Sequence, residues 1–237
     1  RLLYTCARFH IDRYEYEAAE TELFEAERGF AAREDAIGLA DVQLQWAMIA
    51  LLQGRYQDAF TLASHLVETL PDTANLRGRA IRILGVALMN LGEVEAGTEH
   101  LEQALPLYRA DGDISALSHL LQDLQVAYTH LGRLDESGAY LQEYVALRRS
   151  LGGAGALALA LNNLGYYYHQ RGDYIQARTT FQEGLSVISR VSDRRAISCG
   201  VWATFCAIWP ITTRRLVCIP GRSICTTTAS QGYGSPS

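Results

Sequence analysis

Four glycines stand in the same local setting at nearly constant intervals, and this periodicity limits the chain to a repeat architecture. They are Gly54, Gly92, Gly132 and Gly172, separated by 38, 40 and 40 residues. An apolar or aromatic residue follows each glycine two positions later, and a small residue follows five positions later. The pattern predicts a helix-turn-helix unit, because glycine readily takes the left-handed conformation that ends one helix and allows a tight reversal.

Residue size predicts how these helices pack. Small residues should let the two helices of a unit approach closely: Gly85 and Gly165 on first helices, with Ala59, Gly97, Ser137 and Ala177 on second helices. Larger apolar residues should fill the space between units: Leu84, Leu124, Leu164, Leu101, Leu141 and Phe181.

These residues resemble the tetratricopeptide repeat (TPR), whose pattern runs apolar-Gly-x-x-Tyr, then Gly-x-Tyr-x-x-Ala, then an aromatic residue and Ala. The fifth repeat matches at Leu164, Gly165, Tyr168, Gly172, Tyr174, Ala177 and Phe181, with Gly184 where Ala is usual. The resemblance implies an all-α fold, a right-handed α-solenoid of helix-turn-helix hairpins. Five repeats are expected within residues 1–195, at approximately 1–36, 41–75, 79–112, 119–152 and 159–192.

Two positions depart from the pattern. Tyr14 stands where the first repeat should have its turn glycine, so that repeat is interpreted as a partial hairpin. Pro106 lies deep in the second helix of the third repeat. Because proline lacks the N–H for the helical hydrogen bond, we expect it to kink that helix or end it early.

Residues 196–237 do not continue the array. Acidic residues end at Asp193, and four of the five cysteines fall in this stretch, at 199, 206, 218 and 225. Their spacing lacks the close pairs of a zinc site, and the stretch is too apolar for a flexible linker. We interpret it as a sixth repeat read in a shifted frame and poorly ordered, because the alternative frame permits LGNLLRYLADYDEALGLYTRA, which has the repeat's register.

Composition and motifs argue against several classes of protein. A net charge of −5 argues against direct nucleic-acid contact by this segment. Neither a signal peptide nor an apolar run of about 18 residues is visible, which predicts a cytoplasmic protein without membrane contact. No phosphate loop, HExxH or GxSxG motif occurs, and His119, His130 and His169 fall on different predicted helices. We therefore expect no catalytic residues, no metal site and no cofactor.

Function in such an array is expected on the concave groove lined by first helices. The phase of those helices places Leu44 and seven candidate ligand-binding residues there: Met48, Arg82, Val86, Gln122, Val126, Asn162 and Tyr166. Arg82, Gln122 and Asn162 share one phase position, and they could bind a peptide backbone or carboxylate. Ordinary solvated helix surface is the alternative interpretation.

The repeats also resemble, in their length, those of the sensor arrays of bacterial MalT-like transcriptional regulators. This resemblance implies a non-catalytic regulatory segment that binds a protein, a peptide or a small effector in signal transduction. A free-standing scaffold for protein assembly is the alternative. Without a helix to cap the fifth repeat, self-association through the C-terminal end is a further expectation.

Overall fold

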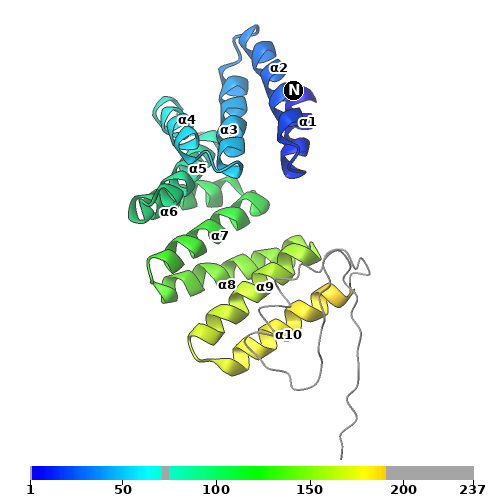
Figure 1. The fold of residues 1–237 in the computed structure, drawn as a ribbon, viewed down its shortest axis with the longest axis vertical. Helices are drawn as coiled ribbons and strands as arrows, with labels where there is room; N and C mark the ends of the chain where they lie inside the picture. Colours follow the sequence, from blue (N-terminus) through cyan, green and yellow to red (C-terminus); the bar gives the residue numbers. More distant parts are fainter. Residues whose placement is uncertain (1, 71–74, 191–237) are drawn as a thin grey trace, which may run out of the picture. The chain divides into compact units, whose positions relative to one another are not determined.

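A computed structural model of the chain describes residues 2–70 and 75–190. Residue 1, residues 71–74 and residues 191–237 lie outside this description, so the shifted-frame interpretation of residues 196–237 stays a prediction. Ten α-helices make up the described part of the chain, and they are drawn in Figure 1. In order they are α1 (Leu2–Asp12), α2 (Tyr16–Ala31), α3 (Ala36–Leu52), α4 (Tyr56–Thr69), α5 (Asn75–Leu91), α6 (Val94–Asp111), α7 (Ile114–His130), α8 (Leu134–Leu151), α9 (Ala154–Gln170) and α10 (Tyr174–Arg190).

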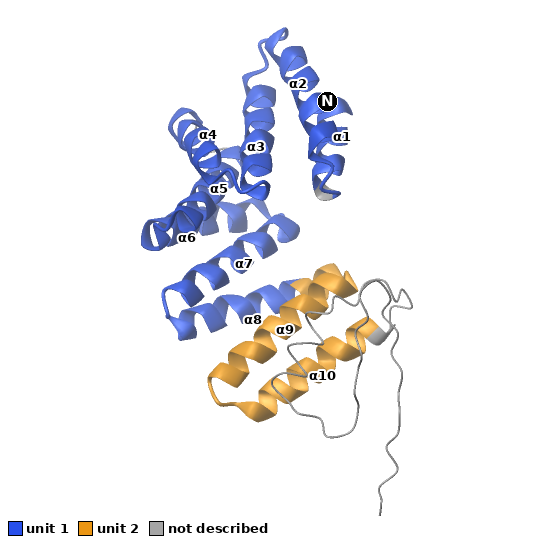
Figure 2. Cartoon of the chain, in the orientation of Figure 1, with its two compact units in different colours: residues 1–147 blue, residues 148–237 orange. Residues whose placement is uncertain are grey.

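The helices pair into five consecutive hairpins, numbered here 1 to 5. We call the first helix of each hairpin its A helix (α1, α3, α5, α7, α9) and the second its B helix (α2, α4, α6, α8, α10). The chain divides into two compact units, residues 1–147 and 148–237, which Figure 2 colours separately. Unit 1 holds α1 to α7 and most of α8, and unit 2 holds the last turn of α8 with α9 and α10.

The predicted turn glycines have the backbone that the prediction requires. Gly54, Gly92, Gly132 and Gly172 have φ between 70° and 99°. At Gly54 the following N–H, of Arg55, donates to the carbonyl of Ala50 over 2.8 Å, a bond that closes the end of the A helix.

Hairpin 1 has the same turn without a glycine. Tyr14 takes φ of 62°, and the N–H of Glu15 donates to the carbonyl of His10 over 2.9 Å. The expectation of a partial hairpin is therefore wrong in one respect, because both helices and the turn are present. The A helix is nevertheless shorter, with 11 residues in α1 against 17 in α3.

Close approach within a hairpin depends on glycine, as predicted. A β-carbon on Gly85 of α5 would lie 2.8 Å from the carbonyl oxygen of Gly97 on α6, and one on Gly97 would lie 2.6 Å from that of Gly85. In unit 2, a β-carbon on Gly165 of α9 would lie 2.7 Å from the ring of Phe181 on α10. No real β-carbon tolerates such distances, so these glycines set the spacing of the helices.

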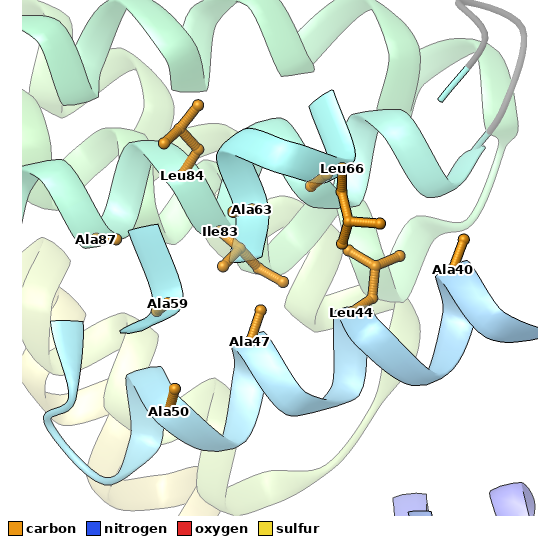
Figure 3. Packing of buried hydrophobic residues seen from close by; sticks show 11 residues of the cluster. Ala40, Leu44, Ala47, Ala50, Ala59, Ala63, Leu66, Ile83, Leu84 and Ala87 are labelled. Carbon is orange, nitrogen blue, oxygen red and sulfur yellow. The ribbon is translucent and has the colours of Figure 1, made fainter. Parts of the chain in front are cut away.

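Apolar residues fill the space between consecutive hairpins. Figure 3 shows one cluster, in which Ala59, Ala63 and Leu66 of α4 meet Ile83 and Leu84 of α5. Leu44 belongs to this cluster and is fully buried, pointing toward Leu66. The expectation that Leu44 faces the groove is therefore wrong.

Two sequence-based boundaries differ from the helices observed. Helix α6 continues past Pro106 to Asp111, so the proline does not end it early. The A helices of hairpins 2 to 5 also begin four or five residues before the predicted repeat ranges, at Ala36, Asn75, Ile114 and Ala154. The TPR pattern covers only the middle of the A helix. Two of these starts are marked instead by capping carboxylates, since Asp35 accepts from the N–H of Gly38 and Asp113 from that of Ala116.

Candidate binding face of the A helices

The candidate binding residues lie on A helices, and we call the side of these helices that carries them the A face. In unit 1, Met48 and Val86 are partly buried against the apolar clusters, whereas Val126 is exposed. Arg82 and Gln122 are half-buried. The A face of unit 1 therefore offers less open apolar surface than the sequence phase suggested.

A chain of polar contacts links the A helices of hairpins 1 to 3. The hydroxyl of Tyr4 on α1 donates to Asp41 Oδ1 on α3 over 2.8 Å. Arg79 on α5 donates to the same oxygen over 2.8 Å, and Gln45 Nε2 donates to the Tyr4 hydroxyl over 3.1 Å. Burial and the bond to Asp41 raise the pKa of Tyr4. Burial alone would lower the pKa of Arg79, but Asp41 and Tyr4 together outweigh it and raise that pKa.

A second polar contact links hairpins 3 and 4. Arg82 Nε on α5 donates to Asp123 Oδ2 on α7 over 2.6 Å. Burial disfavours the charged guanidinium, yet Asp123 and Tyr108 together raise the pKa of Arg82. The charge that we predicted for a ligand carboxylate is therefore satisfied inside the protein.

Gln122, which shares the phase position of Arg82, also has an internal partner. The hydroxyl of Tyr144 on α8 donates to Gln122 Oε1 over 3.2 Å. Val126 lies one turn further along α7 with 37% of its surface exposed. The amide nitrogen of Gln122 can still donate to a ligand, beside this apolar side chain.

Unit 2 presents the more open part of the A face. On α9, Leu159 is 45% exposed and Tyr166 is 46% exposed. Asn162 lies between them at helical spacing, and its Oδ1 is buried without a hydrogen-bond partner. A buried acceptor without a partner costs free energy of about 1–3 kcal/mol.

Sequence reasoning missed the partners Tyr4, Asp41, Arg79 and Asp123. A usable signal was present, because Asp41 and Arg79 lie 38 positions apart and Arg82 and Asp123 lie 41 positions apart. Opposite charges about one repeat apart on A helices can meet across adjacent hairpins. Within the described ranges, no cluster of three or more metal-binding side chains occurs, and no helix is long and apolar enough to cross a membrane.

Comparisons with known proteins identify the fold. No curated protein matches the sequence. Among solved structures, the Rap protein in complex with the Competence and Sporulation Factor has a TM-score of 0.69 at 17% identity, over 82% of this chain and 55% of that one. The chain thus spans about half the length of that protein. Aspartyl phosphate phosphatase F from Bacillus subtilis has a TM-score of 0.70 at 12% identity, over 89% of this chain and 55% of that one.

A third structure is matched over nearly its whole length. It contains the TPR-like repeats of a Podosopora anserina kinesin light chain, with a TM-score of 0.60 at 19% identity, over 80% of this chain and 94% of that one. The fold class is therefore the one predicted, an all-α solenoid of TPR-type hairpins. Residues 120–189 match the tetratricopeptide repeat family itself.

Proposed function

We propose that this chain is a non-catalytic binding scaffold that holds a protein segment or peptide on its A face. The observation that carries the proposal is the α9 surface, where half-buried Asn162 lies between exposed Leu159 and Tyr166. An extended peptide suits this surface, since its side chains cover apolar area and its backbone can form hydrogen bonds with polar side chains. Gln122 and Val126 provide a similar polar and apolar pair in unit 1.

The wider context that we propose is the sensor segment of a bacterial signalling protein or transcriptional regulator. Support comes from the Rap protein, a structure of the same fold with a bound factor, of which this chain matches 55%. The alternative is a free-standing adaptor for protein assembly, and the near-complete coverage of the kinesin light chain repeats favours it. A small effector would suit the sensor context equally. The phosphatase named above shares the fold at 12% identity, which carries no argument for catalysis.

The A face can be tested with a peptide library. Random dodecapeptides displayed on phage would be selected against the full chain, and the affinity of enriched peptides measured by calorimetry. We expect Asn162→Ala and Tyr166→Ala each to weaken binding by about 5- to 30-fold, the usual effect of losing an important contact. Tyr166→Ala should keep the melting temperature of the parent, and Asn162→Ala should not lower it, because that change removes an unpartnered buried acceptor.

Tyr174→Ala is the matched control, because Tyr174 is an exposed tyrosine of the same unit at the turn between α9 and α10. It should leave the affinity unchanged. Undiminished binding by the Asn162→Ala, Tyr166→Ala double variant would exclude α9 as the binding surface.

A further inference from the structure

Helix α2 has a large aromatic side chain at a position where the other four B helices have a polar one. Phe24 lies ten residues after the turn residue Tyr14 and is 58% exposed. Ten residues after the turn glycines of hairpins 2 to 5, the chain has Ser64, Glu102, Gln142 and Gln182. These four residues are half-buried or exposed although another hairpin precedes each of theirs. A preceding hairpin therefore does not cover this position, and the exposure of Phe24 belongs to hairpin 1 itself.

A second position on α2 shows the reverse exchange. Thirteen residues after the turn, hairpins 2 to 5 have apolar residues that are buried or partly buried: Val67, Leu105, Val145 and Leu185. Hairpin 1 has half-buried Glu27 there. One turn of α2 thus exposes an aromatic ring and presents a carboxylate at the two positions where the repeat has the opposite. Packing within the array does not require either exchange.

Acidic side chains lie on the same side of α2 as Phe24. Glu17 and Glu20 stand seven and four residues before it, and Glu27 stands three residues after it. Residues at these spacings share one side of an α-helix. We call Glu17, Glu20, Phe24 and Glu27 the acidic α2 face. It covers ten residues, or about 15 Å of helix, which a partner helix of about three turns can follow.

The carboxylates of this face are largely free to bind a cation. Glu20 lies 3.7 Å from Arg55 in the turn of hairpin 2. Among the described residues, the carboxylates of Glu17 and Glu27 have no ion-pair or hydrogen-bond partner. Arg28 is the one basic residue of α2 beside five glutamates, so the helix has a net charge of −4. The exposed ring of Phe24 therefore lies in a negative potential.

This combination selects the chemistry of a partner. Aromatic side chains surrounded by polar ones are typical anchors of protein interfaces, and complementary charge steers the partner toward them. Negative charge repels nucleic acid and anionic membrane surfaces. It also disfavours a second copy of this chain, which would bring an α2 helix of the same charge.

We propose that the acidic α2 face binds a cationic amphipathic helix of a partner protein. An apolar side chain of that helix would cover Phe24, and Lys or Arg side chains one or two turns away would pair with Glu17 and Glu27. The inference goes beyond the proposed function, because α2 is a B helix and the A face takes no part in it.

A synthetic helical peptide tests the proposal on the full chain. The probe is an alanine-based helix with Lys, Lys, Leu and Lys at the spacing i, i+3, i+7 and i+10, and its counterpart has Glu in place of each Lys. Fluorescence anisotropy at physiological salt should show binding of the Lys peptide and not of the Glu peptide. Phe24→Ser, which introduces the residue of hairpin 2, should weaken binding by about tenfold or more and keep the melting temperature of the parent.

Glu17→Gln and Glu25→Gln form a matched pair, because each removes one exposed glutamate from α2 and Glu25 lies outside the acidic α2 face. Glu17→Gln should weaken binding of the Lys peptide by about two- to fivefold, the range of an exposed ion pair. Glu25→Gln should leave the affinity unchanged. The Asn162→Ala, Tyr166→Ala double variant should bind this peptide like the parent, which separates the acidic α2 face from the A face.

Equal effects of Glu17→Gln and Glu25→Gln would mean unspecific attraction to an acidic protein and would overturn the proposal. Unchanged affinity of Phe24→Ser, or a failure of the chain to prefer the Lys peptide over the Glu peptide, would do the same. A dimer of the chain in sedimentation that Phe24→Ser dissolves would identify a second copy, and not a cationic helix, as the occupant.

Discussion

The backbone of Tyr14 lies in the left-handed region, where a β-carbon crowds the carbonyl oxygen that follows it. The hydrogen bond from Glu15 to the carbonyl of His10 holds the residue there. The side chain is 73% exposed and makes an edge contact with Tyr16, which offers little compensation. Hairpin 1 thus stores strain at a position where the other hairpins have glycine.

Tyr14→Gly should relieve this strain and raise the free energy of unfolding by up to about 1 kcal/mol, because the left-handed penalty of about 1–2 kcal/mol exceeds the entropy cost of glycine. The reciprocal change, Gly54→Tyr at φ 76°, should lower it by a similar amount. Urea denaturation of both variants checks the prediction, and a loss of stability in Tyr14→Gly would contradict it.

The sequence alone identified four turn glycines and the glycines at close helix contacts. Glycine takes the left-handed conformation, or allows two helices to touch, at a lower cost in free energy than any other residue. Sequence reasoning placed the first turn at Tyr14 but interpreted the missing glycine as a sign of a partial hairpin, since the conformation there is imposed by the flanking helices and not by residue type. Likewise, Leu44 has the phase of a groove residue, but its burial depends on how α4 and α5 pack over it. Asn162 was predicted as a binding residue, yet its unpartnered oxygen is visible only in the structure.

Among whole helices, the contact between α5 and α6 is set by two backbones that touch. The paired glycines bring each helix against a carbonyl of the other, and a backbone cannot move aside as a flexible side chain can. Pro106, by contrast, does not interrupt the helix in which it lies. Helix α6 loses one hydrogen bond there, but buried Ala104 and Tyr108 on either side of the proline keep the helix continuous.

Gly85→Ala should separate α5 from α6 and lower the free energy of unfolding by about 1–3 kcal/mol, the usual cost of overpacking a core. Gly155→Ala is the matched control, because that glycine is also helical and a β-carbon there meets nothing within 4 Å. It should raise stability by up to about 1 kcal/mol through helix propensity. Thermal unfolding followed by circular dichroism distinguishes the two, and equal effects would refute the packing argument.

Across the molecule, consecutive hairpins are joined by ion pairs as well as by apolar clusters. Arg82 with Asp123 is half-buried and joins A helices, with side chains 20% and 21% exposed. Arg109 with Glu143 joins B helices in unit 1, and Arg149 with Glu183 repeats that pair 40 residues later in unit 2. The half-buried pair of Arg82 and Asp123 should contribute most to the free energy of unfolding, because water screens the two exposed pairs.

Arg82→Ala should therefore lower the free energy of unfolding by about 1–3 kcal/mol, since it leaves the Asp123 carboxylate half-buried without its charged partner. This differs from the sequence-based expectation that Arg82 serves a ligand. Arg109→Ala is the control, with an expected cost of at most about 1 kcal/mol. Chemical denaturation measures both, and a stable Arg82→Ala variant with weakened peptide binding would restore the original interpretation.

The polar bonds between hairpins share one further property, because they join residues close in the sequence. The widest separations among them, from Tyr4 to Gln45 and from Arg82 to Asp123, are 41 positions. Within residues 2–70 and 75–190, these bonds do not join distant parts of the chain, so little loop-closure entropy opposes their formation and folding should be fast. Each hairpin can dock on its predecessor as soon as it leaves the ribosome, and the array grows in the order in which it is translated.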